Sequence, residues 1–264
     1  MGSGVFDGFM AYWNRDHWHL HLPRSHLNRF LTGCRRMDLS HRWTVERLER
    51  GVLELLAGCP KTTHYIRPIA YRPQPEILLT PSRSLPVTVC MFGVGATRDD
   101  DRSLTAQVSS VTRVSSAAIP VRWKVCGAYA NSFIAQTRAE EKGFDTAIFL
   151  DRERRVCEAS VANLFFVADR GLVTPRLDAD VFPGLTRSLL LRLAAELGIA
   201  VSERPVRPEE LARFEGAFVC STLTEIRPLR AIDGVVYASA SHPLVRRLLA
   251  AFRDLTHERS AYPA

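Results

Sequence analysis

The sequence predicts an α+β fold of two domains, a small α/β domain at residues 1–115 and a larger one at 116–264. Amphipathic segments with helical spacing alternate with short apolar segments that proline and glycine bound, which is typical of a mixed fold. A chain of 264 residues can bury either one large core or two smaller ones. Residues 109–118 are mostly small, which suits a crossing between two domains.

In the predicted small domain, residues 21–33 read as a strand end followed by a short helix. Residues 44–57 predict a second helix, because apolar side chains recur at positions 45, 48, 52, 55 and 56. Three strands are expected after it, separated by proline-rich turns, at 64–71, 76–79 and 86–93.

In the predicted large domain, residues 130–142 form a helix. Pro183 opens an amphipathic helix that ends at Gly198, matching the preference for proline at a helix start and glycine after its end. A basic helix is expected near 243–255. The strands are expected at 145–150, 156–158, 163–167, 217–220 and 235–237.

The composition is that of an ordinary soluble globular protein, with 46% hydrophobic and 24% charged residues. The sequence has no apolar run of eighteen residues and no signal-peptide pattern at its start, so we expect a cytoplasmic protein that does not span a membrane. The six cysteines are scattered without a C-x-x-C pair, which favours reduced thiols.

The formal net charge of +7 does not indicate a nucleic-acid-binding protein, because the 35 basic residues are spread along the chain without a basic block or a known motif. Small anionic ligands suit such a surface equally well. His17, His19 and His21 alternate along one segment, but few carboxylates lie near them, so we predict a half-exposed strand and no metal.

Only three of the 35 basic residues are lysines, namely Lys61, Lys124 and Lys142. Arginine stays protonated, whereas a desolvated lysine amine can lose its proton and form a Schiff base. Lys61 lies in a predicted turn and Lys142 at the charged end of a predicted helix. Lys124 lies among apolar neighbours in Ile119-Pro-Val-Arg-Trp-Lys-Val-Cys-Gly, so it is the best candidate for a chemical role.

Four segments follow one another in the order of the class IV aminotransferase signatures: Lys124–Tyr129, Glu158–Phe165, Pro183–Arg187 and Ser221–Glu225. The intervals from the lysine to the glutamate and to the two later threonines, 34, 62 and 98 residues, are similar to those of branched-chain aminotransferases. The chain therefore resembles this family over about residues 5–237. The resemblance implies a fold type IV enzyme that uses pyridoxal 5'-phosphate (PLP), with a barrel-like β-structure in the large domain.

The resemblance implies a role for each matching residue. Lys124 is expected to form a Schiff base with PLP and to move the proton during catalysis. Glu158 resembles the carboxylate that keeps the cofactor ring nitrogen protonated. Tyr129 resembles the tyrosine that hydrogen-bonds the cofactor's phenolate oxygen; a plain core tyrosine is the alternative.

The phosphate of the cofactor needs N–H donors and positive charge. The start of the helix after Pro183 can supply backbone amides, from Leu185 and Thr186. Arg29, in His26-Leu-Asn-Arg-Phe30, resembles the family's phosphate arginine, which can bind two oxygens at once. Ser221 and Thr222 are the expected donors from the last signature.

Substrate contacts are expected from Phe6, Tyr65, Arg67 and Leu223. Tyr65-Ile-Arg67-Pro resembles the branched-chain enzymes' segment over the substrate side of the cofactor, and Phe6 resembles a pocket wall; core roles for Phe6 and Tyr65 are the alternative. Leu223 departs from the family, which tends to have small residues in that loop, and Ala128 stands where many relatives have asparagine. The chain starts at the family's Gly-x-Gly-Val-Phe segment, which leaves two alternatives open: a small domain shortened at its N-terminus, or a start that is an artefact.

These implications add up to a predicted ping-pong aminotransferase that acts on a 2-oxo acid and an amino acid, with branched-chain or similar hydrophobic L-amino acids favoured. A homodimer is expected, with no nucleic-acid or membrane partner. Three alternatives remain open: a lyase of the aminodeoxychorismate type, a D-amino-acid transaminase, and a non-catalytic binding protein of the same fold.

Overall fold

The computed structural model describes residues 2–39, 42–73, 85–96, 102–169, 171–177 and 180–258. The chain divides into two compact units, of which the first comprises Met1–Arg98, Arg122–Tyr129 and Thr256–Ala264, and the second Asp99–Val121 and Ala130–Leu255. The predicted strand at 76–79 lies outside the described residues. Within those residues, no helix is both long and apolar enough to cross a membrane.

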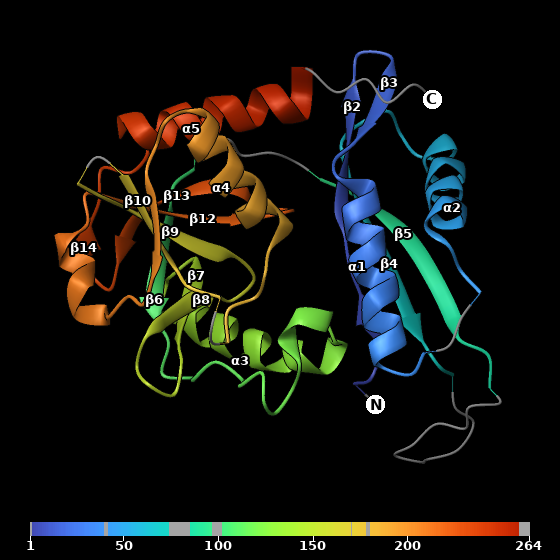
Figure 1. Cartoon of the computed structure of the whole chain (residues 1–264), viewed down its shortest axis with the longest axis horizontal. Helices are drawn as coiled ribbons and strands as arrows, with labels where there is room; N and C mark the ends of the chain where they lie inside the picture. The colour runs from blue at the N-terminus through green and yellow to red at the C-terminus, as the bar shows by residue number, and fades with distance from the viewer. Residues whose placement is uncertain are drawn as a thin grey trace. The chain divides into compact units, whose positions relative to one another are not determined.

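The first unit contains a five-stranded antiparallel sheet and two helices, α1 (Pro23–Arg36) and α2 (Val45–Ala57). The central strand β4 pairs with β1 and β2 along one edge and with β5 along the other, and β2 forms a hairpin with β3. Figure 1 shows α1 and α2 beside these strands. The strands are β1 (Val5–Phe6), β2 (Phe9–Asn14), β3 (His17–Leu20), β4 (His64–Tyr71) and β5 (Thr88–Gly95).

The two faces of β4 have different environments. Ile66 and Ala70 belong to the apolar core that the sheet shares with α1 and α2. Successive side chains of a strand point to opposite faces. Tyr65 and Arg67 therefore lie on the face away from that core, and Phe6 of β1, which follows the core residue Val5, lies on the same side. The sheet thus presents three of the predicted substrate-binding residues on one face.

The second unit is built on a nine-stranded mixed sheet in the order β11-β10-β9-β12-β13-β6-β7-β8, with β14 paired to β13. Three of the pairings are parallel: β10 with β11, β13 with β6, and β6 with β7. The sheet curls, so that β8 at its end contacts β9 and β10. The strands are β6 (Leu104–Val108), β7 (Thr146–Leu150), β8 (Val156–Ala159), β9 (Asn163–Ala168), β10 (Gly171–Pro175), β11 (Val201–Arg204), β12 (Gly216–Ser221), β13 (Glu225–Ile232) and β14 (Val235–Val236).

Apolar side chains from these strands form the main core of the second unit, with Phe166, Leu164 and Ala217 fully buried in it. Helix α3 (Tyr129–Glu140) packs Ala135 and Ala139 against β7 and β8 in a separate apolar cluster. Helices α4 (Leu185–Glu196) and α5 (Pro243–Arg253) contact each other, and α4 also contacts β11 and β12 (Figure 1).

The boundary between the units precedes the predicted division near residue 115, because β6 pairs with β7 and β13 and so belongs to the second sheet. The predicted half-exposed strand of alternating histidines corresponds to β3 and the residue after it. His19 and His21 are more buried than expected, at 4% and 6% exposure. The His19 ring stacks on Tyr12 of the neighbouring strand, with centroids 6.0 Å apart.

Candidate active site

Lys124 lies between two short 3₁₀ turns, η1 (Val121–Trp123) and η2 (Cys126–Ala128), and its backbone is fixed by the start of the chain. The backbone N–H of Phe6 donates to the carbonyl of Lys124 at 3.2 Å, and the N–H of Cys126 donates to the carbonyl of Gly4 at 2.8 Å. Lys124 has φ +50°, a left-handed conformation that costs a non-glycine residue about 1–2 kcal/mol. These contacts hold the lysine backbone in a conformation that it would not adopt alone.

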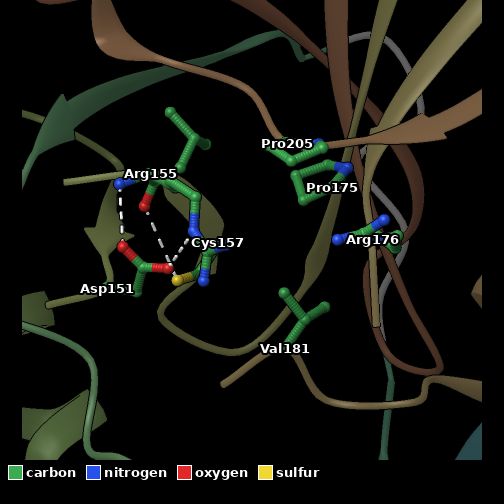
Figure 2. A pocket seen from close by; sticks show the side chains of 8 residues that line it. Asp151, Arg155, Cys157, Pro175, Arg176, Val181 and Pro205 are labelled. Carbon is green, nitrogen blue, oxygen red and sulfur yellow. Dashed lines mark hydrogen bonds and ion pairs between the residues drawn. The ribbon is translucent and has the colours of Figure 1, made fainter. Parts of the chain in front are cut away.

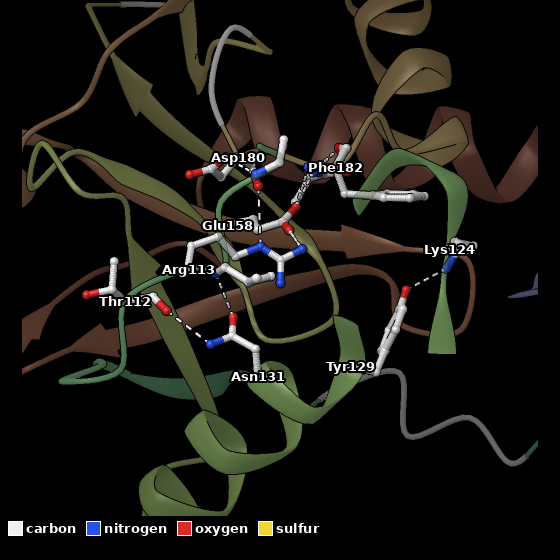
Figure 3. A network of polar contacts seen from close by, with 11 residues as sticks. Thr112, Arg113, Lys124, Tyr129, Asn131, Glu158, Asp180 and Phe182 are labelled. Carbon is white, nitrogen blue, oxygen red and sulfur yellow. Dashed lines mark hydrogen bonds and ion pairs between the residues drawn. The ribbon is translucent and has the colours of Figure 1, made fainter. Parts of the chain in front are cut away.

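The side chains of Lys124, Tyr129 and Phe6 meet. Lys124 Nζ donates to Tyr129 Oη at 2.9 Å (Figure 3). The same Nζ lies 4.9 Å from the centre of the Phe6 ring, and the Phe6 and Tyr129 rings contact edge to face at 4.7 Å. The Phe6 ring and the Tyr129 hydroxyl oxygen therefore hold the amine of the half-buried Lys124 in place.

Arg67 and Tyr65 of β4 continue the group of contacting side chains that begins with Lys124, Tyr129 and Phe6. The Arg67 guanidinium carbon lies 5.0 Å from the Phe6 ring centre and 5.2 Å from that of Tyr65. A Cβ on Gly8 would lie 2.0 Å from Tyr65 Oη, so only glycine leaves room for the Tyr65 ring there. The structure thus brings together Phe6, Tyr65, Arg67, Lys124 and Tyr129, all predicted from the sequence.

Arg29 is held by a buried carboxylate that the sequence interpretation did not single out. Arg29 Nε and Nη2 donate to the two oxygens of Asp7 at 2.7 and 2.8 Å, and His26 Nδ1 lies 2.8 Å from Asp7 Oδ1. Burial disfavours the charged form of Asp7, but the Arg29 charge and the hydrogen bonds from Arg29 and His26 outweigh it and hold the pKa of Asp7 well below its usual value. Burial in turn lowers the pKa of His26.

In the second unit, Glu158 lies at the end of β8 and is 4% exposed. Its Oε1 pairs with Arg113 Nη2 at 2.7 Å. Its Oε2 accepts from the backbone N–H of Phe182 at 2.9 Å and from Asn163 Nδ2 at 3.2 Å (Figure 3). Every one of these partners is a donor, which favours the ionised carboxylate.

Helix α4 begins at Leu185, with Gly184 as its N-cap residue and no side-chain cap. The first N–H groups of a helix have no partner within the helix and carry the positive end of its dipole. A Cβ on Gly184 would lie 2.2 Å from Asn163 Oδ1, so the glycine allows the helix start to approach the asparagine that also binds Glu158. Thr186 is buried in the first turn.

The last predicted signature forms the turn between β12 and β13. Ser221 ends β12, and its Oγ accepts from the backbone N–H of Thr224 at 3.1 Å, which fixes the turn. Thr222 is half-buried, and the Leu223 side chain is 54% exposed. The leucine expected to depart from the family pattern therefore projects from this turn without a core role.

Four residues that make these contacts carried no functional assignment from the sequence: Asp7, His26, Arg113 and Asn163. Asp7 directly follows the family's Gly-x-Gly-Val-Phe segment, His26 begins the segment that contains Arg29, and Asn163 lies within the glutamate signature. Position in or beside a motif was therefore the available signal. Arg113 is one of 32 arginines and gave no local signal at all.

A hollow in the second unit lies between the Asp151–Cys157 segment and Pro175, Arg176 and Pro205 (Figure 2). Arg155 Nε pairs with Asp151 Oδ2 at 2.6 Å beside it. Burial holds the pKa of the Cys157 thiol above its ordinary value, which keeps this cysteine protonated and unreactive. None of the predicted site residues is among its described lining, so we assign it no part in the chemistry.

The residue types fit a PLP-dependent enzyme. The cofactor needs an amine for its aldehyde, an anionic partner for its ring nitrogen, and donors for its phosphate. In the first unit, Lys124 could supply the amine and Arg29 a positive charge. In the second unit, the buried Glu158 carboxylate accepts from donors only in the contacts given above, and the start of α4 could supply N–H groups. The fold and these groups define the class: a two-unit PLP enzyme.

The sequence of the chain matches the family model of the class IV aminotransferases over residues 4–232. It is 33% identical over 239 residues, 88% of this chain and 76% of the other, to a probable branched-chain-amino-acid aminotransferase from Aquifex aeolicus. The chain belongs to the class IV aminotransferase family, whose members use PLP, and the prediction of that family is confirmed.

Solved structures agree with this assignment. A branched-chain aminotransferase from Thermoproteus uzoniensis with norvaline superposes with a TM-score of 0.91 at 33% identity, covering 97% of this chain and 86% of the other. The PLP form of a branched-chain aminotransferase from Thermobaculum terrenum gives a TM-score of 0.93 at 28% identity, covering 98% and 86%. The predicted α+β, fold type IV architecture is thereby confirmed.

Proposed function

We propose that this aminotransferase moves an amino group between a branched-chain or similarly hydrophobic L-amino acid and a 2-oxo acid, with Lys124 as the residue that binds PLP. The observation that carries the proposal is the contact of Lys124 Nζ with Tyr129 Oη at 2.9 Å against the Phe6 ring. PLP, when bound, supplies an aldehyde carbon and a ring that withdraws electrons from the reacting bond.

The remaining cofactor contacts follow from the chemistry of the side chains. Glu158 binds the ring nitrogen, because its ionised carboxylate favours the protonated form of that nitrogen. Leu185 and Thr186 at the start of α4 bind the phosphate through backbone amides. Arg29 adds positive charge to the phosphate, and Ser221 and Thr222 add hydroxyl donors.

The substrate is bound, in this proposal, by the face of β4 and by the turn after β12. The Phe6 and Tyr65 rings offer apolar contact to an aliphatic side chain, and Arg67 offers charge to a carboxylate. Leu223 adds an exposed apolar side chain. The relative from Thermoproteus uzoniensis was solved with norvaline, an apolar amino acid, which agrees with this preference.

The proton transfers are assigned to Lys124. With PLP bound, Lys124 Nζ would take the proton from the substrate Cα and later release it, and Tyr129 Oη would orient the amine for both transfers. The amino acid would react first and leave as a 2-oxo acid, its amino group would stay on the enzyme-bound cofactor, and a second 2-oxo acid would then take that group up. This order is ping-pong, so we expect parallel double-reciprocal plots.

Absorbance of bound PLP tests the role of Lys124. We expect purified protein to show the visible band of lysine-bound PLP and Lys124→Ala to lose it together with activity. Lys142→Ala is the matched control, because Lys142 is exposed and has no assigned role. Absence of the band in the wild type, or its persistence in Lys124→Ala, would overturn the proposal.

Product analysis separates the proposed reaction from its rivals. Incubation with L-leucine and 2-oxoglutarate should yield glutamate, whereas glutamate formed with D-amino acids alone would indicate a D-amino-acid transaminase. Release of pyruvate from an aminochorismate would indicate a lyase. A protein that binds no PLP would be a non-catalytic relative.

The resemblance to class IV aminotransferases also leads us to propose a cytoplasmic homodimer. Light scattering coupled to size-exclusion chromatography tests the dimer, with a monomer mass as the contrary result. Fractionation of cells that produce the protein tests the location.

A further inference from the structure

Glu158, the carboxylate proposed to bind the cofactor ring nitrogen, forms a buried ion pair with Arg113. Arg113 Nη2 and Glu158 Oε1 are 2.7 Å apart, and their side chains are only 7% and 6% exposed. Burying two charges costs desolvation free energy, which their attraction offsets only where geometry and further hydrogen bonds are good. The pair therefore calls for an explanation of what holds it and what it does.

The Arg113 side chain is held on two further sides. Its Nε donates to the carbonyl oxygen of Asp180 at 3.3 Å. Its guanidinium carbon lies 5.3 Å from the centre of the Phe149 ring, in a cation–π arrangement. A carbonyl and an aromatic face thus orient the planar guanidinium that pairs with Glu158. Figure 3 shows the contacts of Arg113 with Asp180 and Glu158.

The Arg113 backbone is held as well. Asn131 at the start of α3 donates through Nδ2 to the carbonyl of Thr112 at 3.0 Å and accepts through Oδ1 from the N–H of Val114 at 2.9 Å. The Arg113 N–H itself donates to the carbonyl of Leu150 at 2.9 Å. One asparagine side chain therefore clamps the two residues that flank the arginine, which fixes where its side chain starts (Figure 3).

Glu158 shares its other oxygen between two neutral donors. Phe182 N–H donates to Oε2 at 2.9 Å, and Asn163 Nδ2 lies 3.2 Å from the same atom while also donating to the Phe182 carbonyl at 2.8 Å. Among these contacts, Arg113 is the charged one. It is the partner that most strongly favours the anionic carboxylate over the protonated one.

We propose that Arg113, clamped by Asn131, is a positioning residue that holds the Glu158 carboxylate anionic and correctly oriented, so that the shared proton resides on the cofactor ring nitrogen. This inference rests on the proposed role of Glu158. The proton between a carboxylate and a pyridine nitrogen can lie on either atom. The guanidinium charge stabilises the arrangement of carboxylate with protonated nitrogen over that of carboxylic acid with neutral nitrogen.

Nuclear magnetic resonance of PLP labelled with ¹⁵N in its ring reports where that proton lies. In wild-type holoenzyme we expect the chemical shift of a protonated ring nitrogen. In Arg113→Gln we expect a shift towards the neutral value and a fall in kcat of about tenfold or more, the change that one unit in the ring-nitrogen pKa corresponds to. Arg113→Lys keeps the charge but loses the planar fork, so it should restore part of both.

Three further variants make the result decisive. Arg155→Gln breaks a partly buried ion pair of the second unit, with Asp151, and should leave the ¹⁵N shift unchanged. Asn131→Ala removes the clamp and should move the shift in the same direction as Arg113→Gln, by less. If Arg113→Gln does not fold, Arg113→Lys and Asn131→Ala carry the test.

The outcomes separate this inference from the proposed function. If Glu158→Gln moves the ¹⁵N shift and the Arg113 and Asn131 variants do not, the inference is overturned and the role of Glu158 stands. If Glu158→Gln leaves the shift unchanged, both the role of Glu158 and the inference fail. If the wild type binds no PLP, the proposed function itself fails.

Discussion

Replacing Asp7 by asparagine should destabilise the protein strongly. The Asp7 carboxylate is fully buried and accepts from Arg29 Nε and Nη2, from the Gly8 N–H at 2.8 Å, and contacts His26 Nδ1. Asparagine keeps the shape but turns one acceptor into a donor and leaves the Arg29 charge without its counter-charge. Breaking a buried pair by removing one partner costs about 3–5 kcal/mol in the free energy of unfolding.

Equilibrium urea unfolding measures this effect. With an m value of about 2 kcal/mol/M, the loss corresponds to a fall of about 2 M in the urea midpoint. The matched control is Asp16→Asn, because Asp16 pairs with His17 in an exposed contact and its loss should leave the midpoint unchanged.

The effect should depend on pH in a defined direction. The folded-state pKa of Asp7 lies below its ordinary value of 3.8, so the unfolded state binds more protons than the folded state around that pH. The stabilisation is therefore complete above about pH 5 and is lost as the pH falls below the unfolded pKa towards the folded one. The gap in stability between wild type and Asp7→Asn should narrow over the same range. A midpoint at pH 7 within about 0.5 M of wild type, or a gap that widens in acid, would refute the reasoning.

Two further predictions concern glycines and thiols. Gly184→Ala should weaken PLP binding, because its Cβ would lie 2.2 Å from Asn163 Oδ1. Gly51→Ala, in α2 with nothing within 4 Å, should instead raise the free energy of unfolding by about 0.5–1 kcal/mol. PLP titration and urea unfolding of both variants check this, and equal effects of the two substitutions would contradict it. The exposed Cys90 should react with an alkylating reagent in the native protein. Mass spectrometry should find the three buried cysteines, Cys34, Cys157 and Cys220, modified only on unfolding. Burial raises the pKa of all three thiols, to about 12 for Cys34.

Elements whose causes are local were predictable from the sequence. The helix expected at 44–57 is α2, which starts after Thr44, whose Oγ1 accepts from the N–H of Arg47 at 3.2 Å, and its apolar spacing sets the buried face. The strand expected at 64–71 is β4 with the same bounds, because its alternation is strict. The four signatures also predicted the right family, because several motifs in the family's order are more specific than any one of them.

Elements whose causes are distant were not predictable. Strand β6 is short, and it is a strand because β7 and β13 pair with it from positions far along the chain. The left-handed backbone of Lys124 depends on contacts with Gly4 and Phe6, which no local pattern encodes. The pairing of Arg113 with Glu158 likewise depends on the folded arrangement. Nothing in the sequence distinguishes Arg113 from the other arginines of this arginine-rich chain.

The first unit is not continuous in sequence, and this affects how the chain is made. Gly33 of α1 packs so closely on the Trp123 carbonyl that an added Cβ would lie 2.7 Å from it, and Val5 forms a β-bridge with Val125. A nascent chain that has emerged through Arg98 holds the strands and both helices of this unit but lacks the segment they pack against. The unit gains Arg122–Tyr129 only after the first strand of the second unit has been synthesised, and it gains Thr256–Ala264 later still. A fragment cut at Arg98 therefore leaves Val5 without its bridge partner Val125, and it lacks Lys124, the residue proposed to bind the cofactor.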